Sequence, residues 1–305
     1  MTHAPSIDPA ASVLVAGGEV DPNVLALLRC LHDRKIACEA LLVGQSTHPR
    51  VTWDLQADVL HINGEERRPT AIFVRHDVFT SLAERRPEPG FRALSWFTTL
   101  AGWAQSHAHV RMLNRASARH MTNKLHVLRL AQEVGLDIPV TLVTNDADLL
   151  TREAKTRSLV VKPVNGGDYT RALPDVLEIA PRKGESLAAP AIVQERLTPP
   201  EIRVYGIGGR FFAFQLVADA LDYRSTTDCK VLPVSEADLP KGLLNDLATL
   251  MQRLELDFGA ADFKACPETG KLKFLEINNG PMFAAFDAAS KGRLTGAISD
   301  FLSGP

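Results

Sequence analysis

The stretch KLKFLEINNGP, residues 271–281, places an acid and an amide on one face of an otherwise apolar strand. A strand alternates its faces with a period of two residues, so Glu276 and Asn278 point to the same side. Taken alone, the stretch allows two interpretations: the end of a strand that meets water, or two oxygen ligands for a hard cation. Other parts of the chain decide between them.

A second acid lies on the strand before it. Pro267 and Gly270 predict a turn that joins the two strands as a hairpin. Across a loop of about four or five residues, antiparallel pairing sets Asp262 opposite Glu276 or within one residue of it. Opposed side chains have Cβ atoms about 5 Å apart, so two carboxylates repel unless a cation lies between them. With the amide they offer oxygen ligands that suit Mg²⁺; the alternative is a solvated strand pair in which one acid has a raised pKa.

Two lysines earlier in the chain lie where an anion is expected. Lys162 is the only charge in the apolar run LVVKPV, so it must reach an anion or the surface. Gly166 and Gly167 follow it, and a glycine turn can close over phosphates with its N–H groups. Lys124 is in the first turn of a predicted helix, where a cation opposes the helix dipole unless an anionic ligand compensates. Exposed surface lysines are the alternative in both cases.

The bulk composition excludes several classes of protein. The 305 residues suggest two or three domains, and a net charge of −2 gives no basic field for nucleic acid. No apolar run approaches the ~18 residues of a membrane span, and the start MTHAPSIDPAAS lacks a signal-peptide pattern. The cysteines are far apart with no C-x-x-C pair, which indicates thiols in a reducing cytosol. They are Cys30, Cys38, Cys229 and Cys266.

The first part of the chain predicts an α/β domain that ends near residue 114. A strand at residues 12–18, a helix and a second strand form a β-α-β opening, followed by a predicted hairpin over 51–64. The first turn lacks G-x-G-x-x-G spacing, which argues against a dinucleotide oxidoreductase. In the amphipathic helix that follows, Trp96 and Trp103 either share a buried face or hold a peptide strand.

The second part predicts antiparallel strands with helices between them. Within residues 122–139 the sequence predicts a helix that has a polar start and ends at Gly135, with Pro139 just beyond it. A hairpin with a Gly-Gly turn covers 201–217, and the helix over 242–256 has an apolar stripe. This pattern differs from a regular β-α-β wind.

Taken in order, these features resemble the ATP-grasp superfamily over residues 114–286. The segments are NKLHVLRLAQEVGLDIPVTLVTND, LVVKP, GG, IVQERLTPPEIRV, DYR, DFKA and FLEIN. The chain is most similar to RimK-type peptide ligases and, closer still, to graspetide (microviridin-type) macrocyclases, which carry the same Asn-Lys-Leu helix start and an Asp-aromatic-Arg element, here Asp222 to Arg224.

The resemblance implies an ATP-grasp fold of mixed α/β and α+β class. The expected domains are a Rossmann-like N-terminal α/β domain (1–114), a central lid (115–195) and a C-terminal antiparallel-sheet domain (196–305), with ATP between the last two.

The resemblance also implies roles for matching residues. The ATP phosphates would be held by Lys124 and Lys162, with Gly166 and Gly167 nearby. The adenine hinge would run through Gln194, Glu195, Arg196 and Leu197, with Glu201 near the ribose. Mg²⁺ would be held by Asp262, Glu276 and Asn278, and the transferred phosphate and acyl phosphate would face Arg203 and Arg224.

The activity implied is ATP-dependent, ADP-producing ligation in the cytoplasm. A carboxylate becomes an acyl phosphate that an amine or hydroxyl captures, here on a ribosomal peptide, and a homodimer is expected. After Asn278 the chain continues NGPMFAAFD where the macrocyclases often have Pro and Gly-Gln, so a ligase for free amino acids or other small carboxylates is the alternative. A non-catalytic nucleotide-binding homologue is a third interpretation, against which the lysines and acids argue.

Overall fold

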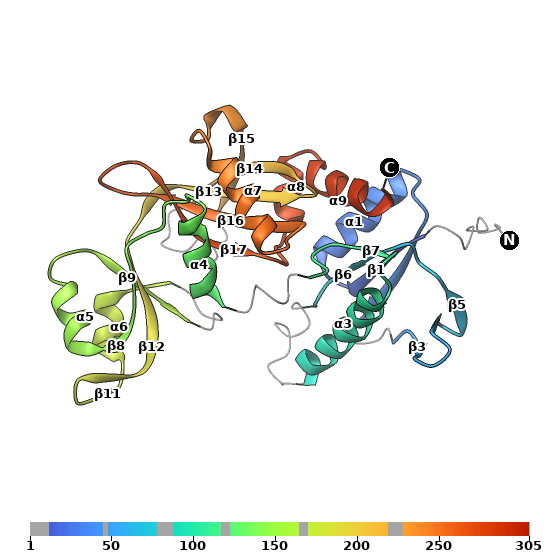
Figure 1. Ribbon diagram of the computed structural model, residues 1–305, viewed down its shortest axis with the longest axis horizontal. Coiled ribbons are helices and arrows are strands. Elements are labelled where there is room, and N and C mark those ends of the chain that lie inside the picture. Colours follow the sequence, from blue (N-terminus) through green and yellow to red (C-terminus); the bar gives the residue numbers. More distant parts are fainter. Residues whose placement is uncertain are drawn as a thin grey trace. The chain divides into compact units, whose positions relative to one another are not determined.

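The structure is a computed structural model that describes residues 12–44, 48–77, 88–116, 123–164, 170–218 and 228–304. The chain divides into two compact units (Figure 1). Unit 1 combines Met1–Arg115 with Met282–Pro305, and unit 2 is Ala116–Pro281. Each unit has its own hydrophobic core, so each is described by itself.

Unit 1 is built on a four-stranded parallel sheet in the order β2-β1-β6-β7. Its strands are β1 (Val13–Gly18), β2 (Cys38–Val43), β6 (Ala71–Val74) and β7 (Arg111–Met112). Parallel strands are covered on both faces, which explains their nearly continuous apolar sequences. The hairpin predicted over 51–64 is confirmed, and a third strand extends it: β3 (Val51–Asp54), β4 (Val59–Ile62) and β5 (Glu65–Arg67).

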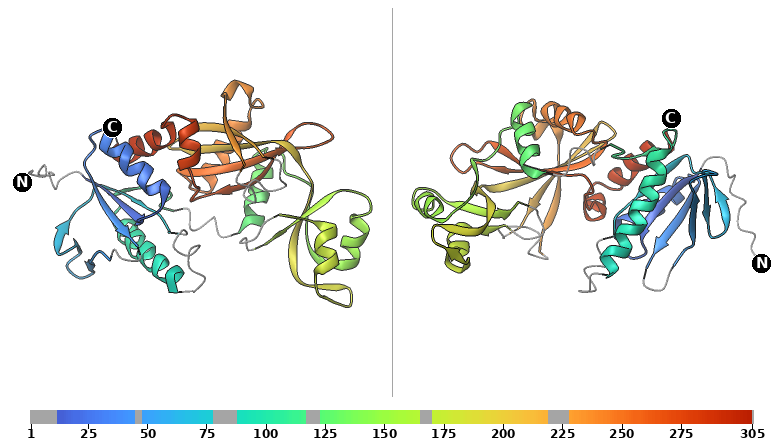
Figure 2. Two further views of the ribbon diagram at one scale, coloured as in Figure 1. Left: turned by 180° about the vertical axis from the view of Figure 1, so that it is seen from behind. Right: turned by 60° about the horizontal axis from the view of Figure 1, so that its bottom comes forward.

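Helices cover both faces of the parallel sheet (Figures 1 and 2). The helix α3 (Glu88–Ser106) packs on one face, where Leu14 and Ala16 of β1 join its buried Trp103. The other face contacts α1 (Pro22–Asp33) and α9 (Arg293–Ser303), and α8 (Ala284–Ala289) packs against both helices. The last two helices therefore belong with unit 1, whereas the sequence placed them in a C-terminal domain over 196–305. The three-domain division stays a prediction.

Residues 141–195 of unit 2 form a small antiparallel sheet backed by two helices. The strands are β8 (Thr141–Asp146), β9 (Leu159–Pro163), β10 (Arg171–Ala172), β11 (Arg182–Lys183) and β12 (Ser186–Glu195). The helices α5 (Ala147–Glu153) and α6 (Leu173–Ile179) pack on Leu159 and Val193. In the ladder Lys162 pairs with Ile192 and Gln194 with Val160, so Lys162 and Gln194 share the face that points away from these helices.

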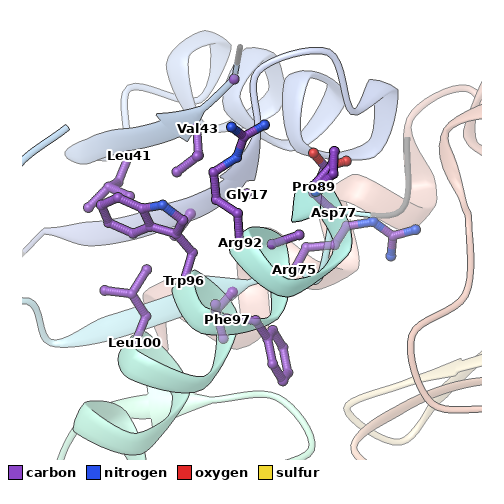
Figure 3. Close-up of a pocket in the computed structure, with 14 residues that line it drawn as sticks. Gly17, Leu41, Val43, Arg75, Asp77, Pro89, Arg92, Trp96, Phe97 and Leu100 are labelled. Carbon is purple, nitrogen blue, oxygen red and sulfur yellow. The ribbon is translucent and has the colours of Figure 1, made fainter. Parts of the chain in front are cut away.

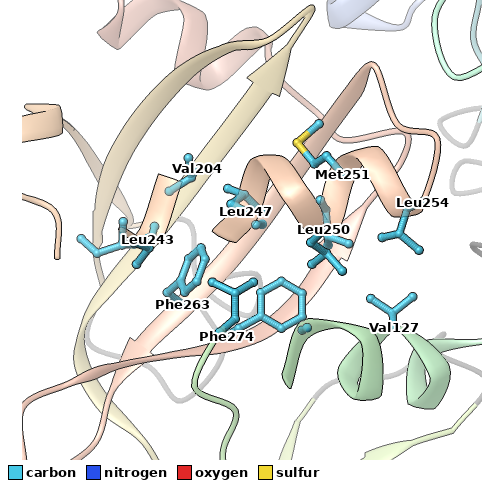
Figure 4. Packing of buried hydrophobic residues seen from close by; sticks show 14 of the residues in the cluster. Val127, Val204, Leu243, Leu247, Leu250, Met251, Leu254, Phe263 and Phe274 are labelled. Atoms are coloured by element: carbon cyan, nitrogen blue, oxygen red, sulfur yellow. The ribbon is translucent and has the colours of Figure 1, made fainter. Parts of the chain in front are cut away.

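The rest of unit 2 is a five-stranded antiparallel sheet in the order β15-β14-β13-β16-β17. The strands are β13 (Thr198–Ile207), β14 (Arg210–Val217), β15 (Lys230–Val234), β16 (Phe258–Ala265) and β17 (Leu272–Asn278). One face packs against α4 (Lys124–Glu133) and α7 (Leu243–Arg253), with a short η3 (Glu236–Asp238) before α7 (Figure 4). At Gly206 a Cβ would lie 2.4 Å from the sulfur of Met251, so the strand needs glycine where α7 comes close.

Candidate functional site

The hairpin of β16 and β17 forms the centre of the candidate site. Asp262 pairs directly with Glu276, as the sequence predicts, and Ala260 pairs with Asn278. The two acids therefore lie side by side on adjacent strands, and the amide follows two residues along the same face.

A bulge in β17 keeps these polar groups together. The ladder passes from Asp262–Glu276 to Phe263–Phe274, which leaves Leu275 as the extra residue. Phe274 and Ile277 both join the core with α4 and α7, although they are three residues apart. Without the bulge, strict alternation would put Phe274 on the same face as Glu276. The bulge therefore separates a fully apolar face from a polar one.

The adjacent strand β13 adds a buried ion pair. Arg203 lies opposite Asp262, and its Nε and second terminal nitrogen donate to the two carboxylate oxygens at 2.7 and 2.9 Å. The two residues are 7% and 5% exposed, so each needs the other to offset the loss of water. This pair fixes the position of one of the two central acids.

Two lysines pair with the remaining acids of this face. Lys124 Nζ lies 2.9 Å from Glu276 Oε2, and Lys264 Nζ lies 2.9 Å from Glu201 Oε2. Lys124 is the first residue of α4, whose N-cap is Asn123, so the carboxylate of Glu276 also compensates the positive end of the helix.

Lys162 differs from these cations because it has no carboxylate partner among the described residues. It is half-buried, and its pKa is lowered chiefly by desolvation. The charge of Glu276 raises the pKa, whereas those of Lys124 and Lys264 lower it further. A cation held in this position lacks the hydrogen bonds that an anionic ligand would supply.

The described side chains of the site carry more positive than negative charge. The cations are Lys124, Lys162, Arg203 and Lys264, and the anions are Glu201, Asp262 and Glu276. An excess of one positive charge, with two acids adjacent, suits a polyanion that binds together with a divalent cation.

The donor set fits such a cation. No group of three or more His, Cys, Asp or Glu residues that could hold a metal is found in the described ranges. Asp262, Glu276 and Asn278 would supply two carboxylates and one amide. Mg²⁺ is usually bound by one or two carboxylates and keeps waters and phosphates as its other ligands, so this small set suits Mg²⁺.

The residues predicted to form the adenine hinge lie at the end of β12. Most of their polar groups already form hydrogen bonds or ion pairs within the protein. The Glu195 carboxylate accepts a hydrogen bond from the Val140 N–H at 2.9 Å and pairs with Lys273. The N–H of Arg196 donates to the Ser158 carbonyl at 2.9 Å, whereas the N–H of Leu197 has no partner among the described residues. The side chain of Glu195 therefore connects strands, and the Leu197 N–H remains able to bind a ligand.

Gln194 lies beside this hinge and is 1% exposed. Its Nε2 donates to the Thr141 hydroxyl at 3.0 Å, but its Oε1 is buried without a hydrogen-bond partner in the part of the chain that the structure describes. Such an acceptor is costly to bury unless something donates to it.

The structure brings together most of the site residues predicted from the sequence. Gly166, Gly167, Asp222, Tyr223 and Arg224 lie outside the described residues.

Two lysines of the site were missed in the sequence. Lys264 follows Asp262 by two residues and so shares its face, which is a signal that the strand pattern contains. Lys273 contacts Glu195 across a separate sheet, which no local pattern shows.

Several solved structures share this fold. The ATP-grasp ligase PsnB, complexed with a minimal precursor, Mg and ADP, is 24% identical, covers 99% of this chain and 100% of its own, and has a TM-score of 0.74. A RiPP-associated ATP-grasp ligase of Chryseobacterium gregarium, in complex with ADP and a leader and core peptide, is 19% identical over 97% of this chain and 98% of its own, with a TM-score of 0.73.

A third structure is the macrocyclase MdnC of Microcystis aeruginosa, bound with the precursor peptide MdnA. It is 17% identical over 97% of this chain and 100% of its own, with a TM-score of 0.72. No protein-family model and no curated protein sequence matches the chain. The ATP-grasp fold predicted from the sequence is thus confirmed.

Proposed function

We propose that this chain, which has the ATP-grasp fold, is an ADP-producing ligase that uses ATP and Mg²⁺ to activate a carboxylate as an acyl phosphate. An amine or hydroxyl then attacks the acyl carbon, which forms the amide or ester bond and releases inorganic phosphate. The observation that carries the proposal is Lys162, a cation without a carboxylate partner among the described residues, beside the paired acids Asp262 and Glu276. The phosphates of ATP would pair with Lys162, and the Mg²⁺ bound to them would be held by the two acids.

Each charged group of the site has a role in this proposal. Lys124 and Lys162 would bind the phosphate oxygens, and the acids with Asn278 would hold Mg²⁺, which neutralises phosphate charge. Arg203 would orient Asp262 and face the transferred phosphate. Phosphoryl transfer depends mainly on such positioning and charge stabilisation.

The hinge would bind the base. The Leu197 N–H and the buried Gln194 Oε1 are the polar groups there that have no partner among the described residues. Glu195 would act indirectly, because its carboxylate already binds Val140 and Lys273. A nucleotide base would thus be read mainly by backbone and buried amide groups.

The substrate proposed is a peptide carboxylate. All three similar structures above were determined with precursor or leader and core peptides, and they cover nearly the whole chain. No helix in the described ranges is both long enough and apolar enough to cross a membrane. The homodimer and the cytoplasmic location stay predictions.

The test is ADP release on mixing the protein with ATP, Mg²⁺ and synthetic precursor peptides that carry acidic core residues. Mass spectrometry should show products lighter by one water for each bond formed. ADP release with free amino acids and none with peptides would instead support the small-carboxylate ligase. Absence of nucleotide binding by calorimetry would overturn the proposal.

A further inference from the structure

Unit 1 contains a cleft that the proposed function does not use (Figure 3). It lies between the carboxyl ends of β1, β2 and β6 and the first half of α3. Its volume is about 420 Å³ when the open, solvent-filled mouth is included. Parallel α/β sheets bind ligands at the carboxyl ends of their strands, so the position itself suggests a binding site.

The walls of the cleft are apolar. Leu41 and Val43 of β2, Val74 of β6, and Trp96 and Leu100 of α3 line it. Whereas Trp103 is 4% exposed in the core, the half-buried Trp96 borders the cleft. Trp103 is therefore a core residue, whereas Trp96 packs against the same core and also borders the cleft, where a ligand can reach it.

The charged side chains at the rim of the cleft differ in whether they can bind a ligand. Arg75 already forms an ion pair, because its Nε lies 2.7 Å from the carboxylate of the buried Asp21. The carboxyl group of Asp77 lies against the backbone of Gly18, where a Cβ would be 2.5 Å away. Arg92 lies one turn before Trp96 and makes no hydrogen bond or ion pair with the described residues. Figure 3 shows Arg92 and Trp96 projecting from the same helix toward β1 and β2.

This combination selects one kind of ligand. Apolar walls favour a hydrophobic side chain, and a guanidinium without a partner among the described residues favours a single carboxylate. A polyphosphate fits poorly, because Asp77 is at the rim and Arg75 is already paired. A peptide with a hydrophobic residue next to an acidic one presents both groups at adjacent positions.

We propose that this cleft binds a hydrophobic side chain of the peptide substrate while Arg92 pairs with the carboxylate of the neighbouring acidic residue. The assignment of the peptide as substrate rests on the proposed function. All residues that line the cleft belong to unit 1, whereas the proposed ATP site is in unit 2. Peptide binding to the cleft can therefore be measured without ATP turnover.

The experiment uses the full chain labelled with ¹⁵N-tryptophan, which gives indole signals from Trp53, Trp96 and Trp103. The signal that disappears in Trp96→Phe is assigned to Trp96. The probe is the blocked peptide Ser-Phe-Asp-Ser, compared with Ser-Phe-Asn-Ser and Ser-Ala-Asp-Ser. We expect the Phe-Asp peptide to shift the Trp96 signal and to bind about tenfold more tightly than either control peptide.

Variants then locate the contacts. Arg92→Ala should remove the preference for Asp over Asn, Arg92→Lys should retain part of it, and Ala93→Leu should fill the cleft and weaken all three peptides. Arg29→Ala, which removes an exposed arginine of α1, is the matched control and should change nothing. Circular dichroism and ADP binding, both expected to be unchanged, show that each variant is folded.

Equal binding of the Asp and Asn peptides, or a preference that survives Arg92→Ala, overturns the assignment. Failure of the two proposals can be told apart. If precursor-dependent ADP release is normal in Arg92→Ala and Ala93→Leu, the cleft proposal fails and the ligase proposal stands. If the probes bind as expected but no peptide elicits ADP release, the ligase proposal fails and the cleft remains a peptide site.

Discussion

At Lys162, ligand binding and stability have opposite requirements. The side chain is half-buried and its pKa is lowered chiefly by desolvation, so the charge destabilises the ligand-free fold. We expect Lys162→Met to weaken ADP–Mg²⁺ binding about tenfold or more, because a charge-assisted contact is lost. The same variant should unfold at a higher urea concentration than the wild type. Calorimetry and urea unfolding measure the two effects.

The pH dependence of stability gives a separate check on Lys162. Its pKa in the folded chain is below the ordinary 10.5, so the unfolded chain binds the proton more tightly. The wild type should therefore gain stability as the pH rises through the window below 10.5, and its difference from Lys162→Met should shrink. Arg129→Met, on the surface of α4, serves as the control. A constant difference, or unchanged ADP affinity, would count against a phosphate-facing Lys162.

The two central acids should respond differently to neutral substitution. Asp262→Asn leaves the buried Arg203 without its charge partner and should lower the free energy of unfolding by about 3 kcal/mol. Glu276→Gln breaks a partly exposed pair with Lys124, so its cost should be below about 1 kcal/mol.

Both variants should nevertheless lose ATP turnover, since each removes a proposed Mg²⁺ ligand. Chemical denaturation and ADP release measured on the same samples separate stability from activity. Near-normal turnover in either folded variant would contradict the metal assignment.

At the scale of elements, strands with regular alternation were predicted correctly, whereas the bulge that interrupts one of them was not. The hairpins of β13–β14 and β16–β17 follow from alternation and from Gly-Gly and Pro–Gly turns. The Leu275 bulge was not predicted, because it depends on how β17 meets the core behind it.

Short or distant helices were also missed. The helices α5 and α6 have seven residues each, too few to show a clear period. The packing of α9 on α1 joins segments at opposite ends of the chain, which local sequence does not encode. The pairing of Asp262 with Glu276 was more predictable, because paired strands convert spacing directly into proximity.

One buried acid connects the last two helices. Asp287 accepts hydrogen bonds from the Leu294 N–H at 2.9 Å and the Thr295 hydroxyl at 2.7 Å, so it caps α9 from within α8. Asp287→Ala should lower the free energy of unfolding of unit 1 by about 2 kcal/mol, the upper range for a lost cap.

Asp300→Ala is the matched control, because its pair with Arg34 is well exposed and should contribute under about 1 kcal/mol. Thermal or urea unfolding of the two variants measures the difference. Equal losses would mean that the cap does not stabilise α9.

At the scale of the whole molecule, two compact units that share no hydrophobic core predict two separate responses to ligands. ADP with Mg²⁺ should slow amide hydrogen exchange in β9, β16 and β17 of unit 2, because binding opposes local opening there. The Phe-Asp peptide should instead protect α3 and the ends of β1 and β2 in unit 1. Mass-spectrometric exchange of the full chain, with each ligand alone, tests this pattern. Protection of α3 by the nucleotide alone would contradict the separation.

The assembly of unit 1 from both ends of the sequence has a consequence for synthesis. On the ribosome, the strands β1, β2 and β6 emerge early, but α9, which contacts β6 and β7 on one face of the sheet, is made much later. All of unit 2 is translated between them. The nascent chain must therefore keep Phe73 of β6, whose ring packs against Phe283 at the start of α8, without its final cover until α8 and α9 have been made, so unit 2 can complete its core before unit 1 does.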